Sequence, residues 1–172
     1  VLRVLPYRTD SAPVVGVVFT LTDVTELRAG AREIEHQRAQ AQKNLAEIEE
    51  LYRVSPQAMA LIDRDMRFVR VNQRMAEIDG VPIDDHFGRT LAEVMPRLVD
   101  QMAPPATQVF DAGRPVLDRR ISGHTEAHPE QERVWEVDWY PILENGQVRA
   151  VGVNVRDVTH QADMSRELQR VM

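Results

Sequence analysis

A repeated segment places the strongest constraint on how this chain can fold. Residues 14–25, VVGVVFTLTDVT, resemble residues 148–159, VRAVGVNVRDVT, at a separation of 134 positions. In both copies apolar residues alternate with the period of two that is typical of a half-buried strand. The stretches before them, residues 1–8 and 134–141, resemble each other more loosely. The repeat predicts a β-hairpin followed by a helix at each end of the chain.

Both copies end in Asp-Val-Thr, which predicts an abrupt change from strand to helix. Asp and Thr are good N-caps, because a short side-chain oxygen accepts hydrogen bonds from the free N–H groups of the first helical turn. Asp23 and Asp157 therefore mark helix starts, and Thr25 and Thr159 follow them by two residues. Asp23 with Glu26 also comes close to a capping box. We expect each hairpin to be joined to its helix with no flexible spacer.

Residues 26–53 are predicted to form a helix of about 25 residues, because they hold no proline, one glycine and many Ala, Glu, Gln and Arg. Apolar residues recur along it at intervals of seven, while most partner positions three residues later are polar. This pattern predicts a marginal parallel coiled coil and a homodimer. A contact with the helix's own domain, or an inert spacer, remains the alternative. The predicted dimer seam consists of Leu27, Ile34, Ala41, Ile48 and Leu51.

Residues 54–158 have the pattern of one complete α+β domain. Two short strands, residues 58–63 and 67–71, flank a turn at Asp63, and Asn72 follows as the cap of a short helix. A longer helical stretch, interrupted by prolines, ends near Gly113. Three strands come last, at residues 115–121, 132–142 and 147–156, and an Asn-Gly turn joins the final two.

The composition excludes several classes of protein and site. The chain has no cysteine, which rules out disulfides, thiolate zinc sites and cysteine nucleophiles. Its net charge is −6, with no basic patch, so we expect no nucleic-acid partner. The longest apolar run, residues 14–19, is far shorter than the ~20 residues of a membrane span, and no signal peptide opens the sequence. We therefore expect a cytoplasmic segment with no membrane span.

The order of these elements resembles that of a PAS domain, the ligand-sensing and dimerising module of bacterial signalling proteins. The resemblance is carried by residues 55–82, 86–96, 135–142 and 151–159. It implies a five-stranded antiparallel sheet with short helices on one face. Residues 1–25 resemble the last two strands and exit of a second PAS domain that lacks its front part. The implied organisation is a truncated upstream PAS at 1–25, a helical linker at 26–53, a complete PAS domain at 54–158 and the start of an exit helix at 159–172.

The resemblance also implies a function. A sensory and dimerising PAS module would belong to a multi-domain protein of the sensor histidine kinase type, with an effector domain further along the same chain. Asp23, Thr25, Asp157 and Thr159 would couple each sheet to the helix that leaves it. The alternatives are a ligand-free structural PAS interaction module and an input domain for a diguanylate cyclase or a phosphatase. We expect no catalytic residue in this segment, because no carboxylate is placed with a nucleophile or base.

A ligand pocket between the short helices and the sheet is the candidate binding site. Such a pocket would hold a small organic ligand or a non-covalent flavin, and a collapsed core is an equal alternative. A flavin attached to cysteine is excluded. The pocket candidates are Met75, Ile78, Phe87, Leu91, Val94 and Trp139.

Histidines give no support for a metal site. His86 lies near the helix that supplies the axial ligand in haem-binding relatives, but a polar residue is expected there in any case, so we do not expect haem. His124 and His128 are predicted to lie in a loop, where the helical spacing needed to share a metal is lost.

Overall fold

The computed structural model describes residues 1–9 and 12–171 and contains two compact units, residues 1–48 and residues 49 onward. The first unit holds an antiparallel hairpin, β1 (Leu2–Thr9) and β2 (Ala12–Leu21), in which Leu2 pairs with Leu21 and Val4 with Phe19. The helix α1 (Thr25–Val54) follows it. The predicted hairpin and long helix are therefore confirmed.

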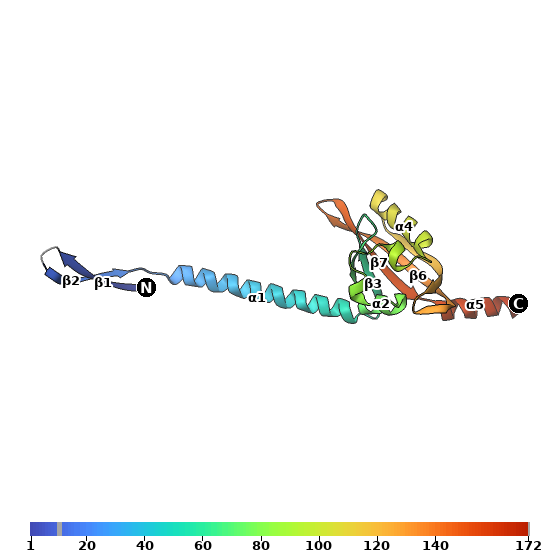
Figure 1. Cartoon of the computed structure of the whole chain (residues 1–172), viewed down its shortest axis with the longest axis horizontal. Helices are drawn as coiled ribbons and strands as arrows, with labels where there is room; N and C mark the ends of the chain where they lie inside the picture. The colour runs from blue at the N-terminus through green and yellow to red at the C-terminus, as the bar shows by residue number, and fades with distance from the viewer. Residues whose placement is uncertain (10–11, 172) are drawn as a thin grey trace. The chain divides into compact units, whose positions relative to one another are not determined.

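The second unit contains one five-stranded sheet in the order β4-β3-β7-β6-β5. All neighbouring strands are antiparallel, which confirms the predicted α+β fold. The strands are β3 (Ala58–Ile62), β4 (Phe68–Val71), β5 (Val116–Thr125), β6 (His128–Glu144) and β7 (Gln147–Asp157). The central position of β7 places the last strand of the chain beside the first strand of the sheet. Figure 1 shows α5 (Thr159–Val171) leaving from the end of β7.

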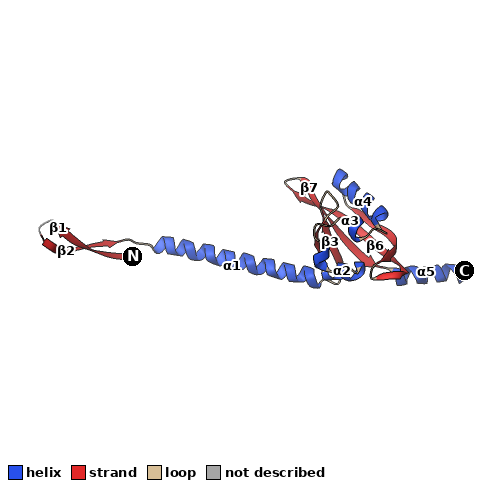
Figure 2. Ribbon diagram, viewed as in Figure 1, coloured by secondary structure: helices blue, strands red, loops and turns tan. Residues whose placement is uncertain are grey.

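Short helices lie between the strands in sequence and pack against the sheet, as Figure 2 shows in blue against red. They are α2 (Gln73–Asp79), the 3-10 turn η1 (Ile83–Asp85), α3 (Leu91–Val94) and α4 (Val99–Ala112). The predicted cap at Asn72 and the predicted helix end at Gly113 are present. Asn72 accepts a hydrogen bond from the N–H of Met75 at 3.0 Å, and Gly80 and Gly113 end their helices in the left-handed conformation.

Asn72 also connects three elements of the second unit. Its Oδ1 accepts from the N–H of Met59 at 3.0 Å, and its Nδ2 donates to the carbonyl oxygens of Gln57 at 2.8 Å and Tyr52 at 3.2 Å. The side chain is 1% exposed, so each of these bonds satisfies a group that water does not reach. The end of α1, strand β3 and the start of α2 are thereby fixed to one another.

The core lies between the helices and one face of the sheet. Alternate residues of the central strands face it, which is the period-two pattern predicted from the sequence. From β6 these residues are Trp135, Val137 and Trp139, and from β7 they are Val151, Val153 and Val155, all at most 7% exposed. Met102, Ala106, Val109 and Phe110 of α4 pack against them.

The hairpin of β5 and β6 is longer than the sequence predicts, and the expectation that His124 and His128 lie in a loop is wrong. β5 runs to Thr125, β6 begins at His128, and the two residues between them make the turn. Gly123 and Pro129 are poor strand formers, but cross-strand pairing overrides that local preference. Ser122 is also held from outside the sheet, since Gln101 of α4 donates to its carbonyl at 2.9 Å.

The structure also shifts the alignment of the two repeats. Val17 pairs with Pro6, and its equivalent Val151 pairs with Pro141. The first strands therefore correspond at a separation of 135 positions rather than the 133 implied by aligning residues 1–8 with 134–141. A shift of two residues preserves an alternating pattern, which is why the sequence alone does not reveal it.

Among the described residues, no helix combines the length and the apolar character that crossing a bilayer requires.

Candidate functional site

The junction between the sheet and α5 is held by hydrogen bonds of the Val134 backbone and of the Asp157 and Thr159 side chains. The N–H of Val134, on β6, donates to Oγ1 of Thr159 at 3.0 Å, and its carbonyl accepts from the N–H of Val158 at 2.9 Å. Val134, Val158 and Thr159 are all at most 7% exposed. Both backbone polar groups of Val134 are therefore hydrogen-bonded to the start of α5, the carbonyl by a backbone N–H and the N–H by a side-chain hydroxyl.

Asp157 completes this junction, to which we refer as the exit latch (Val134, Asp157, Val158 and Thr159). Its Oδ1 accepts from both the N–H and the hydroxyl of Thr159, at 2.9 and 2.6 Å. Its Oδ2 lies 3.2 Å from Nη1 of Arg133. Partial burial opposes ionisation, but the hydrogen bonds of Thr159 and the charge of Arg133 outweigh it and lower the pKa of Asp157. The carboxylate therefore stays ionised and holds the Thr159 hydroxyl in the orientation that leaves its oxygen free to accept from Val134.

Asp23 and Thr25 repeat the same local geometry before α1. Oδ1 of Asp23 accepts from the N–H and hydroxyl of Thr25 at 2.9 and 2.6 Å, the same two distances as in the exit latch. In the sequence Asp23 and Glu26 come close to a capping box; in the structure the carboxylate of Asp23 accepts from Thr25, two residues on. The hydrogen bonds from Thr25 lower the pKa of Asp23.

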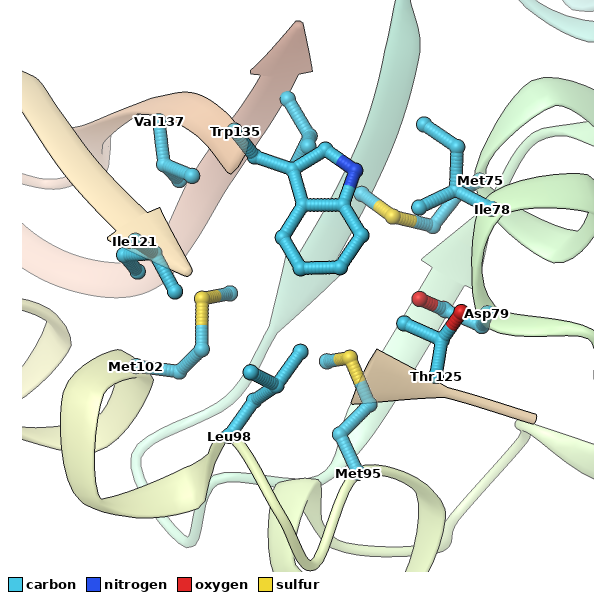
Figure 3. Close-up of a pocket in the computed structure, with 11 residues that line it drawn as sticks. Met75, Ile78, Asp79, Met95, Leu98, Met102, Ile121, Thr125, Trp135 and Val137 are labelled. Atoms are coloured by element: carbon cyan, nitrogen blue, oxygen red, sulfur yellow. The ribbon is translucent and has the colours of Figure 1, made fainter. Parts of the chain in front are cut away.

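A small cavity lies between α2, the region of α4 and the sheet. Its volume is about 20 Å³. Figure 3 shows Trp135 across it, with methionine side chains around its edge. Met75 and Ile78, two of the predicted pocket residues, line it. The others that line it are Asp79, Met95, Leu98, Met102, Ile121, Thr125, Trp135, Val137 and Val155.

The other four predicted pocket residues lie elsewhere. Trp139 and Leu91 are buried in the core at 0% and 1% exposed, but they do not line this cavity. Val94 lines a neighbouring cavity of about 10 Å³. Phe87 is 48% exposed, so the structure corrects its placement.

His86, the residue before Phe87, is the one whose side chain is buried. The backbone of Phe87 bridges to Phe68, and the turn η1 directs the side chain of the preceding residue inward. His86 is 0% exposed and meets the ring of Phe68 edge-on, with the centroids 5.1 Å apart. The 3-10 turn determines whether His86 or Phe87 faces the core. The alternation of apolar residues in the sequence does not predict which of the two it is.

His86 forms a buried pair with Asp79. Its Nε2 lies 3.1 Å from Oδ2 of Asp79, and its Nδ1 lies 2.9 Å from the carbonyl oxygen of Pro82. Because a carbonyl oxygen can only accept, Nδ1 carries a proton, and Nε2 and Oδ2 share another. Burial raises the pKa of Asp79, against the hydrogen bond and charge of His86. Burial lowers the pKa of His86, but its hydrogen bonds to Asp79 and Pro82 outweigh this and raise it overall.

Thr125 also lines the cavity, and the hydrogen-bonding capacity of its hydroxyl is unsatisfied. Thr125 is 7% exposed, and its Oγ1 has no hydrogen-bond partner. Figure 3 shows it beside Asp79. The burial of Asp79 and Thr125 is not visible in the sequence, because neither a lone helix-terminal Asp nor a strand Thr signals burial. Among the described residues, no group of three or more His, Asp or Glu side chains could hold a metal ion.

The predicted dimer seam lies on a helix with no buried residue of its own. Leu27, Ile34, Ile48 and Leu51 are each more than half exposed. Leu45 is exposed as well and was not included in the predicted seam. Apolar side chains on one side of an otherwise polar helix are typical of a surface that a second helix covers.

Solved structures with a similar fold include PAS domains and the protein VqmA. VqmA of Vibrio cholerae, solved as a complex with ligand and DNA, is 18% identical with a TM-score of 0.58, and the match covers 66% of this chain and 51% of VqmA. A PAS domain from Colwellia psychrerythraea is 14% identical with a TM-score of 0.57, covering 67% of this chain and 98% of that one. A PAS domain from a two-component sensor histidine kinase is 10% identical with a TM-score of 0.54, covering 68% and 98%.

These likenesses concern the fold, and the sequence itself gives the family. No protein with a curated description matches the chain. The family described as PAS fold matches residues 52–163, which is more than half of the chain and includes the sheet, the short helices and the exit latch. The chain therefore belongs to the PAS fold family.

Proposed function

We propose that residues 54–158 are the sensory and dimerisation module of a bacterial, cytoplasmic multi-domain signalling protein, and that they relay a change in their sheet to a downstream effector domain through α5. The observation that carries this proposal is the exit latch, in which Val134 on β6 is hydrogen-bonded to both Val158 and Thr159. A shift of β6 would move these partners with it. β7 itself continues into α5, so the latch adds a second strand of the sheet, β6, to the connection with that helix.

The proposed mechanism is a shift between two packings of the sheet and its flanking helices. A stimulus that favours one packing changes the direction or register in which α5 leaves the sheet. In a dimer, two copies of α5 would then present a changed surface to the next domain. Asp157 and Thr159 are the coupling residues in this proposal, with Asp23 and Thr25 in the same role at the start of α1.

The cavity supports the ligand-free alternative over a resident organic ligand. A volume of about 20 Å³ has room for about one water molecule. Met75, Met95 and Met102 fill the space beside Trp135. A module with this core would respond to a partner, or to the packing of its own helices, rather than to a bound metabolite.

A small ligand remains the second candidate, because one observation favours it. Oγ1 of Thr125 is buried without a partner beside the carboxylate of Asp79, and an unsatisfied buried hydroxyl costs about 1–3 kcal/mol. Methionine side chains are unbranched and adapt to a guest, so the cavity can enlarge. VqmA was solved with a ligand, which gives this candidate a precedent within the fold.

For the output, we propose a histidine kinase. A PAS domain from a two-component sensor histidine kinase shares the fold, which supports this choice over a cyclase or a phosphatase. We propose no nucleic-acid role for this segment, although VqmA was solved with DNA. The match covers 51% of VqmA, and the net charge of −6 here gives no support for binding phosphates.

The proposal is tested with the full-length protein by replacing Thr159. In Thr159→Val the shape is kept but the hydroxyl is lost, so we expect output activity to stop responding to its stimulus. Thr159→Ser keeps the hydroxyl and serves as the matched control, with a response close to that of the wild type. A normal response in Thr159→Val, with the fold intact by circular dichroism, would contradict the proposal.

A further inference from the structure

The N-terminal hairpin of β1 and β2 exposes a face whose counterpart in the hairpin of β6 and β7 is buried. We infer that β1 and β2 are the closing hairpin of a second PAS-type sheet, and that the polypeptide preceding Val1 in the natural protein supplies the remaining strands and helices. The inference rests on strand register, on the geometry of the two Asp-Val-Thr junctions and on a contrast in burial.

Strand register gives the first argument. In the hairpin, Leu21, Phe19 and Val17 of β2 pair with Leu2, Val4 and Pro6 of β1. In the complete domain, Val155, Val153 and Val151 of β7 pair with Val137, Trp139 and Pro141 of β6. Each residue of the first set has its counterpart in the second, including the two prolines. The register of a hairpin decides which residues share a face, so the two hairpins present corresponding faces.

The junctions give the second argument. Asp23 with Thr25 and Asp157 with Thr159 make the same two hydrogen bonds at the same distances, 2.9 and 2.6 Å. Each pair joins the second strand of its hairpin to a helix. A hairpin formed by chance alternation of apolar residues would not carry this junction at the same place.

Burial gives the third argument. On the face in question Val4, Phe19 and Leu21 are 51%, 64% and 81% exposed, whereas their counterparts Trp139, Val153 and Val155 are 0%, 1% and 7% exposed. Leu2 and Val17 of the same face are also more than half exposed. An isolated two-stranded hairpin is at best marginally stable in water, so a continuous apolar face on one requires a cover.

The complete domain shows what kind of cover fits. There, β3 pairs with the edge of β7 that faces away from β6, and α4 packs across β6 and β7. Both elements come before β6 in the sequence. By the same order, the cover of β1 and β2 would be a strand along the free edge of β2 and helices over its apolar face, all encoded before Val1. In that arrangement α1 leaves one PAS domain and enters the next, so two domains would act in series.

Amide hydrogen exchange tests this inference in the chain of residues 1–172 and in the natural protein with its preceding residues. In the shorter chain we expect residues 2–6 and 17–21 to exchange rapidly. In the longer protein we expect them to be as protected as residues 137–141 and 151–155. Equally rapid exchange in both chains, or a natural protein that starts at Val1, would overturn the inference. Protection in the shorter chain that increases with protein concentration would also overturn the inference, because the apolar face would then be covered by a second copy of the chain.

A matched pair of variants in the longer protein separates the two faces of β2. Phe19→Asp places a charge on the proposed core face, and we expect the preceding domain to lose its cooperative thermal transition or to melt several degrees lower. Thr20→Asp places the same charge on the opposite face and should change little. Residues 54–158 melt unchanged in both variants. Equal effects of the two substitutions would contradict the assignment of the face.

Discussion

The hydroxyl oxygen of Thr159 accepts a hydrogen bond from the backbone N–H of Val134 at 3.0 Å, although the two residues are 25 positions apart in the sequence. This bond connects the first turn of α5 to β6, in addition to the covalent connection with the end of β7. It also leaves the hydroxyl hydrogen for Asp157, whose Oδ1 lies 2.6 Å away. The side-chain part of the exit latch therefore depends on Asp157 and Thr159 together, and replacing either one disturbs the hydrogen bonds of the other.

Replacing both Asp157 and Thr159 with alanine should weaken the domain without unfolding it. We expect the free energy of unfolding, measured with urea, to fall by about 0.5–2 kcal/mol for each lost cap. Ser165→Ala is the control, because the hydroxyl of Ser165 donates only to the carbonyl of Gln161 within the exposed face of α5. Loss of the cooperative transition in the double variant would show that the latch is needed for folding as a whole.

Stability should decrease with rising pH because of His86. Its pKa is raised in the folded domain, so its contribution is fully present below the ordinary histidine value of about 6.5. The contribution is lost as the pH rises through the folded value, because the shared proton leaves and a buried carboxylate remains. Asp79→Asn should remove this dependence in urea titrations at increasing pH, and Asp84→Asn, at an exposed position, should keep it. An unchanged pH dependence in Asp79→Asn would refute this role for the pair.

Leu91 and Phe87 should respond very differently to truncation. Leu91 is 1% exposed, so Leu91→Ala removes buried apolar atoms and leaves a cavity, at a cost of about 2–5 kcal/mol. Phe87 is 48% exposed, and Phe87→Ala should cost much less. Chemical denaturation of the two variants measures the difference. Similar losses would mean that Phe87 is buried in solution as the sequence analysis expected.

The seam on α1 should determine the oligomeric state. Ile34 is 56% exposed on a helix without buried residues, so Ile34→Asp should convert a homodimer to a monomer in sedimentation velocity. Ala39→Asp introduces the same residue on the opposite side of the helix from Ile34 and should leave the dimer intact. A dimer that survives Ile34→Asp would place the dimer contact elsewhere.

Local chemistry made much of the fold predictable. Asn72, Gly80 and Gly113 fix helix ends through their own side chains or through their freedom to adopt positive φ, so their roles can be seen in the sequence. The alternation of apolar residues in the repeat at 148–159 likewise indicated the core face of β7, where Val151, Val153 and Val155 are buried. The burial of Asp79 and the inward position of His86 could not be predicted, because both depend on how η1 packs against Phe68. The extended hairpin of β5 and β6 likewise depends on pairing between strands.

The most direct test of the central claim is the distance between the sheet and α5. The chain has no cysteine, so cysteines introduced at Glu132 on β6 and Glu167 on α5 would carry spin labels at those two sites only. With the labelled chain diluted in an excess of unlabelled chain, so that a homodimer holds one labelled copy, double electron–electron resonance should give one narrow distance distribution in the otherwise unchanged chain and in Thr159→Ser. The distribution should broaden when Asp157 and Thr159 are both alanine. A broad distribution in the chain with an intact latch, or no change when the latch is removed, would contradict the account.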